Sequence, residues 1–257
     1  MNSGDRLLRI YDALMGLPEN TQMMHAWAKA LDVDPGTPDL EEEISLLVLG
    51  VRREVDVARR RLDLIGVPAG LSEPAFNRLR QVASPTQLNV PWGSHRGNVQ
   101  PPECRKILEW VSWTLKEEAE GEMEPAMLEA LREELDALQT ALGTTDVSPH
   151  LRDFIESQIA AIRGALRMYR VQGAKPIQAA LTKVVGEFKV NEKALQQDLQ
   201  TAPEEAKGIV ARAAAMVEKV AKVADNLSKL KKGVEDVYSI GSTVTATVGP
   251  LIHLLSK

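Results

Sequence analysis

The C-terminal part of the chain carries an uninterrupted series of apolar residues that alternate between spacings of four and three. The series consists of Ile209, Ala213, Met216, Val220, Val223, Leu227, Leu230, Val234 and Val237. A repeat of this kind places all its members along one stripe of an α-helix, and it predicts left-handed pairing with another helix, in the same chain or in a second copy. The sequence therefore predicts a long C-terminal helix that needs a helical partner.

Apolar residues recur at helical spacing over nearly all of the remaining sequence, and the alternation typical of strands is almost absent. We therefore predict an all-α fold, a multi-helix bundle of about nine or ten helices. The predicted helices cover residues 5–15, 21–31, 40–65, 73–83, 104–120, 125–142, 149–172, 176–199 and from 203 onward. Asp39 and Ser148 are placed as N-caps, whereas Gly66, Pro68 and Gly173 are placed to end helices.

The composition fits such a bundle. Hydrophobic residues make up 44% of the 257 residues and aromatic residues only 4%, so the core has to be aliphatic. The single cysteine, Cys104, excludes an internal disulfide framework and favours a reducing compartment, and the acidic N-terminal sequence does not resemble a signal peptide. We therefore expect a cytoplasmic protein.

A stretch rich in proline and glycine, SPTQLNVPWGSHRGNVQPP at residues 84–102, interrupts the helical pattern. Its four prolines and two glycines predict an irregular loop, and a loop of this length marks a functional segment or a domain boundary. The expected organisation is an N-terminal helical subdomain (1–84), this loop (85–102), a central helical subdomain (103–200) and a C-terminal helix with an apolar tail (201–257).

The proline-rich loop also holds the best candidates for contact with a partner, namely Trp92, His95, Arg96 and Asn98. An aromatic ring and a cation on a proline-braced loop suit the recognition of a ligand or a protein. The alternative is structural: Trp92 fills the core and its neighbours satisfy the backbone of the loop.

The tail beyond Asp236 differs from the helix before it, because residues 237–256 contain no charged side chain unless His253 is protonated. Its apolar positions continue as Val237, Ile240, Val244, Val248, Leu251 and Leu255. As a helix, this tail would extend about 30 Å, the thickness of the hydrocarbon core of a bilayer. Its serine and threonine residues equally suit packing on the protein's own bundle or assembly with a second copy, so peripheral or inserted contact with the inner membrane is one of three alternatives.

No motif of catalysis, phosphate binding, dinucleotide binding or metal binding occurs in the sequence, so we expect neither an enzyme nor a cofactor or metal ion. Cys104 is expected to be an inert thiol at the start of a helix. Five arginines, Arg52, Arg53, Arg59, Arg60 and Arg61, alternate with acidic residues around one helix, which indicates paired surface charge and argues against nucleic-acid binding.

Two stretches resemble segments of uncharacterised bacterial all-helical proteins associated with phage-defence or toxin-like loci. One is SPTQLNVPWGSHRGN with the following CRKILEWVSWTL, and the other runs from LREELDALQTAL through the Ser-Pro helix start to IAAIRGALRMYRVQGAKPIQAALTKVVGEF. The resemblance implies a protein whose apolar C-terminal helices are membrane-active, and it carries over no catalytic residue.

These patterns together predict a non-enzymatic interaction or effector protein. Its N-terminal part would bind a protein partner, and its C-terminal helices would act through self-assembly or membrane association. The alternative is a structural or adaptor bundle that binds a protein partner in the cytosol.

Overall fold

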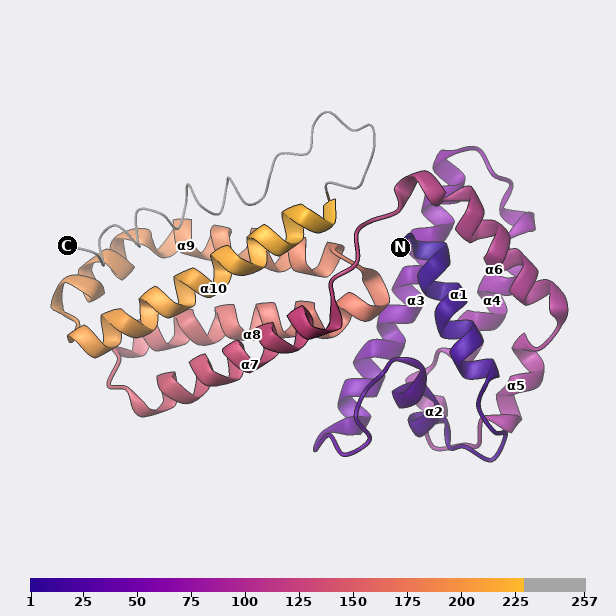
Figure 1. Cartoon of the computed structure of the whole chain (residues 1–257), viewed down its shortest axis with the longest axis horizontal. Helices are drawn as coiled ribbons and strands as arrows, with labels where there is room; N and C mark the ends of the chain where they lie inside the picture. The colour runs from indigo at the N-terminus through magenta and orange to yellow at the C-terminus, as the bar shows by residue number, and fades with distance from the viewer. Residues whose placement is uncertain (229–257) are drawn as a thin grey trace. The chain divides into compact units, whose positions relative to one another are not determined.

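The computed structural model describes residues 1–228, and within them it contains ten α-helices, three short 3₁₀ turns and no β-strand (Figure 1). The predicted all-α fold is therefore confirmed. The chain forms two compact units. We call residues 1–119 with 170–173 the N-terminal unit, and residues 120–169 with the described residues from 174 the bundle unit.

The N-terminal unit is built from six α-helices, most of them short, joined by turns. In chain order they are α1 (Ser3–Met15), α2 (Met23–Ala30), α3 (Leu40–Leu64), α4 (Glu73–Val82), α5 (Gly93–Val99) and α6 (Pro102–Thr114), with 3₁₀ turns η1 (Ala69–Leu71), η2 (Pro85–Gln87) and η3 (Lys116–Glu118). The longest of them, α3, turns a stripe of apolar side chains into the core: Ile44, Leu47, Val48, Val51, Val55, Ala58 and Leu62.

Helices α1 and α6 of this unit approach each other closely. A Cβ built on Gly4 would lie 2.4 Å from the backbone nitrogen of Ser112, so no residue with a side chain fits there without a shift. Asn2 caps α1 through the backbone N–H of Asp5, and its side chain also donates to the carbonyl oxygen of Ser112 at 2.9 Å. The same residues therefore begin α1 and position it on α6.

A buried ion pair crosses the N-terminal unit between α1 and α3. Both Nε and Nη2 of Arg6 donate to Oε1 of Glu54, at 2.9 and 2.7 Å, and the Glu54 side chain is fully buried. Such a pair is costly to break on one side only, because the remaining charge has no access to water.

The ends of α3 and α8 follow the predicted signals with one exception. Gly66 and Gly173 have positive φ angles of 78° and 66°, as residues that end a helix in the left-handed region do. Ser148 accepts a hydrogen bond from the N–H of Leu151 as an N-cap. Asp39 occupies the predicted N-cap position of α3, but its side chain makes no capping hydrogen bond. The acidic residues of the first turn of α3 lie near its positive end.

The bundle unit consists of four long helices that follow one another in sequence: α7 (Pro125–Thr144), α8 (Pro149–Gln172), α9 (Lys175–Thr201) and α10 (Glu204–Ser228) (Figure 1). Short turns join them, so neighbours in the chain run in opposite directions, as in an up-and-down bundle. The apolar stripes of all four helices contribute to one core. The last three residues of α8 and the following Gly173 belong to the N-terminal unit.

The boundary between the units lies at Ala119 and Glu120, which differs from the boundary expected at residues 84–102. The expected irregular loop instead contains η2 and α5, so the prediction that prolines and glycines prevent regular structure there is wrong. The prolines precede or flank these short elements, where they interrupt no helical hydrogen bond.

Candidate interaction surfaces

The proline-rich segment is hydrogen-bonded to the connection between α1 and α2. The N–H groups of Met23 and Met24 donate to the carbonyl oxygens of Val90 and Leu88 at 2.8 and 2.9 Å, and Trp92 N–H donates to Thr21 at 2.7 Å. An isolated antiparallel bridge joins Gln22 to Pro91. These bonds make the segment part of the framework of the N-terminal unit.

Trp92 is fully buried, so its ring fills the core and offers no surface to a partner. The structure therefore shows the alternative in which Trp92 fills the core. The aromatic ring lies in a largely aliphatic interior that also contains the equally buried Trp27 and Phe76.

The other three candidates of the segment differ in their surroundings. Arg96 donates to the carbonyl oxygen of Leu17 at 3.4 Å and lies 3.7 Å from the carboxylate of Glu19, so its side chain holds the segment in place. His95 is half-buried, and Asn98 is exposed.

The described part of the C-terminal stripe is packed inside the bundle unit. Ile209, Met216, Val220 and Leu227 are buried and Val223 is half-buried, and all five pack in the common core of α7 to α10. The helical partners of this stripe are thus in the same chain. The remaining candidates lie outside the described residues: Leu230, Val234, Val237, Ile240, Val244, Val248, Leu251 and Leu255.

The outer face of α3 is a candidate surface that the sequence analysis missed. It consists of Leu46, Leu49, Arg53, Val57, Arg60 and Leu64, which we call the α3 outer face. Leu46 and Leu49 are each 41% exposed and Leu64 is 77% exposed. Spacings of three and four place these residues along one side of the helix. This spacing was present in the sequence, but the inner stripe of α3 accounted for its helical pattern.

The arginines of α3 fall into two groups. Arg52 donates to the carbonyl oxygens of Arg80 and Ala83, and Arg59 lies over the ring of Phe76 and near Asp56. Arg61 lies 3.1 Å from the carboxylate of Glu118.

Arg53 and Arg60 belong to the α3 outer face and are exposed. Neither side chain makes a hydrogen bond or an ion pair within the part of the chain that the structure describes. The prediction of paired charge therefore holds for Arg59 and Arg61. It is wrong for Arg53 and Arg60, and Arg52 binds backbone carbonyl oxygens in place of a carboxylate.

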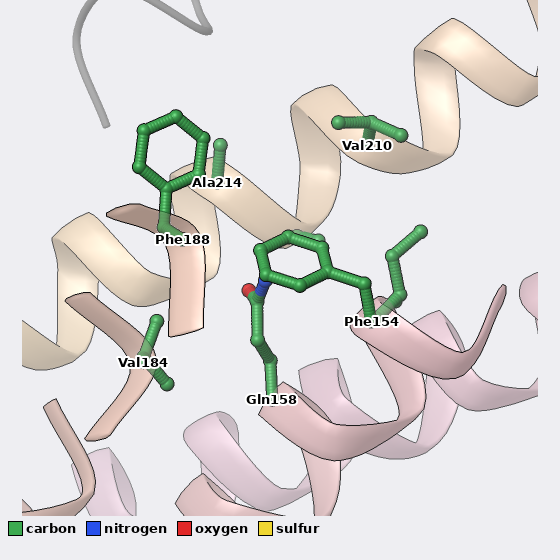
Figure 2. A pocket seen from close by; sticks show the side chains of 8 residues that line it. Phe154, Gln158, Val184, Phe188, Val210 and Ala214 are labelled. Atoms are coloured by element: carbon green, nitrogen blue, oxygen red, sulfur yellow. The ribbon is translucent and has the colours of Figure 1, made fainter. Parts of the chain in front are cut away.

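The bundle unit contains a small gap between α8, α9 and α10 (Figure 2). Its lining is apolar except for the buried Gln158, which projects from α8 one turn after Phe154. The gap measures about 20 Å³, which is space for about one water molecule, so it cannot hold an organic ligand.

Two potentially reactive side chains of the N-terminal unit, Cys104 and Tyr11, have structural roles. Burial raises the pKa of the Cys104 thiol and that of the Tyr11 phenol, whose hydroxyl donates to the carbonyl oxygen of Val99 at 3.0 Å. A raised thiol pKa leaves little thiolate at neutral pH, which makes Cys104 a poor nucleophile.

Ser148 and His150 both contact Oδ2 of Asp198, at 3.0 and 3.1 Å, at the end of the bundle where α8 begins. The carboxylate lies between the serine and the histidine, so His150 is not placed as a base for the serine hydroxyl. The sequence analysis did not identify this cluster, because Asp198 is 48 residues away from His150.

No protein family, curated protein or solved structure matches this chain. Within residues 1–228, no group of His, Cys, Asp and Glu side chains could hold a metal ion. None of the helices in the same range is long and apolar enough to cross a membrane.

Proposed function

We propose that this chain is a non-enzymatic interaction protein whose N-terminal unit binds a protein partner. The observation that supports this function is the uneven distribution of exposed apolar side chains. Six of the eight large hydrophobic residues that are most exposed within residues 1–228 belong to the N-terminal unit: Leu46, Leu49, Leu64, Ile65, Leu71 and Trp113. Exposed apolar groups that gather on one part of a molecule are typical of contact sites.

The effector function proposed from the sequence requires an output by the C-terminal helices. Because the stripe up to Leu227 is buried in the bundle core, its self-assembly would require the bundle to open. We therefore assign any membrane contact or assembly to residues 237–256, which lie outside the described residues. Burial of the stripe favours the second candidate function, an adaptor that binds a partner without such an output.

Site-specific photo-crosslinking in the cells that produce the protein tests the binding function. A photoreactive residue replaces Leu49 or Leu64 in the full chain, and Val190, 84% exposed in the bundle unit, provides the matched control position. We expect a discrete crosslinked species from the first two positions and none from the third. Crosslinking that is absent, or equal at all three positions, contradicts partner binding by the N-terminal unit.

Flotation with anionic liposomes separates the effector from the adaptor. The full chain and a chain that ends at Asp236 are compared. Flotation of the full chain alone supports a membrane-active tail, whereas equal failure of both chains supports the adaptor. The resemblance to defence-associated proteins would gain support only from the first result.

A further inference from the structure

The α3 outer face combines three features that together restrict what can bind it. It extends about 27 Å from Leu46 to Leu64, at 1.5 Å per residue. Leucines stand at both ends, half-buried Val57 lies in the middle, and Arg53 and Arg60 stand on either side of it. The face is therefore long and narrow, and two cations interrupt its apolar side chains.

The guanidinium groups of Arg53 and Arg60 form no ion pair with a carboxylate in the part of the chain that the structure describes. Other arginines of the same helix contact carboxylates that are in reach, since Arg61 lies 3.1 Å from Glu118 and Arg59 lies 3.9 Å from Asp56. Guanidinium groups favour carboxylates, with which they form two parallel hydrogen bonds. Arg53 and Arg60 are seven residues apart, so matching carboxylates on a parallel or antiparallel helix would also stand one heptad apart, about 10 Å.

We propose that the α3 outer face binds an amphipathic helix of a protein partner that presents leucine-like side chains and two carboxylates one heptad apart. This proposal rests on the binding function assigned to the N-terminal unit. The helix lies along α3, and its apolar side chains pack between Leu46, Leu49 and Leu64 as anchors of a helical interface. The two ion pairs fix its register.

The charges around the face disfavour other anionic partners. Exposed Glu41 and Glu42 stand at the start of α3, and exposed Asp63 flanks Arg60 near its end. These carboxylates repel the continuous negative charge of a nucleic acid or of an anionic membrane surface. Binding to either of these surfaces needs several adjacent cations. A peptide helix with carboxylates at two positions avoids Glu42 and meets both arginines. The acidic start of α3 also favours one orientation of the bound helix.

Two fluorescent synthetic peptides of equal composition test the proposal. Both are amphipathic leucine-bearing helices, but one carries its two glutamates seven positions apart and the other carries them four positions apart. Fluorescence anisotropy with the full chain is expected to show saturable binding of the first peptide and about tenfold weaker binding of the second.

The double variant Arg53→Glu and Arg60→Glu should weaken binding of the first peptide by about tenfold or more. Lys106→Glu with Lys189→Glu is the matched control, because both lysines are exposed and the change in net charge is the same. Leu46→Asp with Leu49→Asp should abolish binding, while circular dichroism and tryptophan fluorescence confirm that this variant folds.

Four results would overturn the proposal: no saturable binding of the first peptide, equal binding of both peptides, equal loss in the arginine variant and its control, or tighter binding of duplex DNA or anionic vesicles through Arg53 and Arg60. If any of these results is found while crosslinking at Leu49 or Leu64 still yields a discrete species, the partner-binding function stands and only the acidic-helix assignment fails.

Discussion

The two units of this chain reach stable helical folds by different means. In the bundle unit, four long helices pack one after another through apolar stripes. In the N-terminal unit, helices that are mostly shorter also bury apolar side chains, and polar contacts between distant residues connect them, such as Arg6 with Glu54 and Asn2 with Ser112. Periodicity alone specifies the first kind of packing, whereas the second requires particular residues at particular places.

All four tryptophans of the chain, Trp27, Trp92, Trp110 and Trp113, belong to the N-terminal unit. Tryptophan fluorescence therefore reports the unfolding of this unit alone, whereas far-ultraviolet circular dichroism reports both units. Each of the following tests uses this difference.

The largest expected effect comes from Arg6→Met, which leaves Glu54 charged and buried without its partner. The N-terminal unit should lose about 3 to 5 kcal/mol of its free energy of unfolding. In a denaturant titration, the fluorescence transition should move to lower concentration, and a second step should remain in circular dichroism. Arg6→Met with Glu54→Leu should recover most of the loss, and a double variant as unstable as the single one would show that the ion pair is not its cause.

A smaller loss is expected from Gly4→Ala, because the new methyl group would meet the α6 backbone at Ser112. Overpacking of this kind costs about 1 to 3 kcal/mol and should again appear in fluorescence. Gly97→Ala in α5 is the control in the same unit, since nothing lies within 4 Å of its Cβ position. Equal stability of the two variants would contradict the close approach of α1 and α6.

Alkaline pH should also lower the free energy of unfolding of the N-terminal unit, by less than the substitution Gly4→Ala does. Because burial raises the pKa of Cys104 and of Tyr11, the folded unit holds these protons more tightly than the unfolded chain does. Its stability is therefore complete below the ordinary pKa of a thiol and falls as pH rises through the raised values. Fluorescence-monitored denaturation above about pH 9 should show this fall.

In Cys104→Ala the fall with pH should be shallower, since the thiol no longer titrates. A slope identical to that of the native chain would show that the thiol contributes nothing. Reaction of Cys104 with a thiol reagent at neutral pH should also be slow in the folded protein and fast in denaturant.

The smallest expected effect is a gain in the stability of the bundle unit. Gly186 lies within α9 and nothing is within 4 Å of its Cβ position. Gly186→Ala should stabilise the bundle by about 0.5 to 1 kcal/mol because alanine is the better helix former. The gain should appear in circular dichroism with the fluorescence transition unchanged, and movement of both transitions would show that the units unfold together.

The sequence predicted the elements of the fold better than their assembly. Helix ends such as Gly66, Gly173 and Ser148 were recognised because their signals are local. α5 was missed because a seven-residue helix between prolines and glycines has no apolar period long enough to detect.

The candidate site residues show the same difference between local features, which the sequence predicts, and contacts between distant residues, which it does not. Trp92 was considered for a surface role, but its burial depends on hydrogen bonds to residues about 70 positions earlier, such as Thr21. The arginines of α3 could be identified in the sequence, but those with a partner could not be distinguished from those without one. The reason is that the acceptors of Arg52 and Arg61 come from other parts of the fold.

The N–H of Gly121 donates to the carbonyl oxygen of Leu227 at 2.9 Å, which joins the segment before α7 to the last turn of α10. The chain thus enters and leaves the described bundle at the same end. A pulling force applied between Ala119 and Ser228 would load this hydrogen bond first and then peel α7 from α10 one turn at a time. Under such a force the contacts of the bundle would break one after another. A force applied along the helices from opposite ends would load many contacts together, so unfolding would require a larger force.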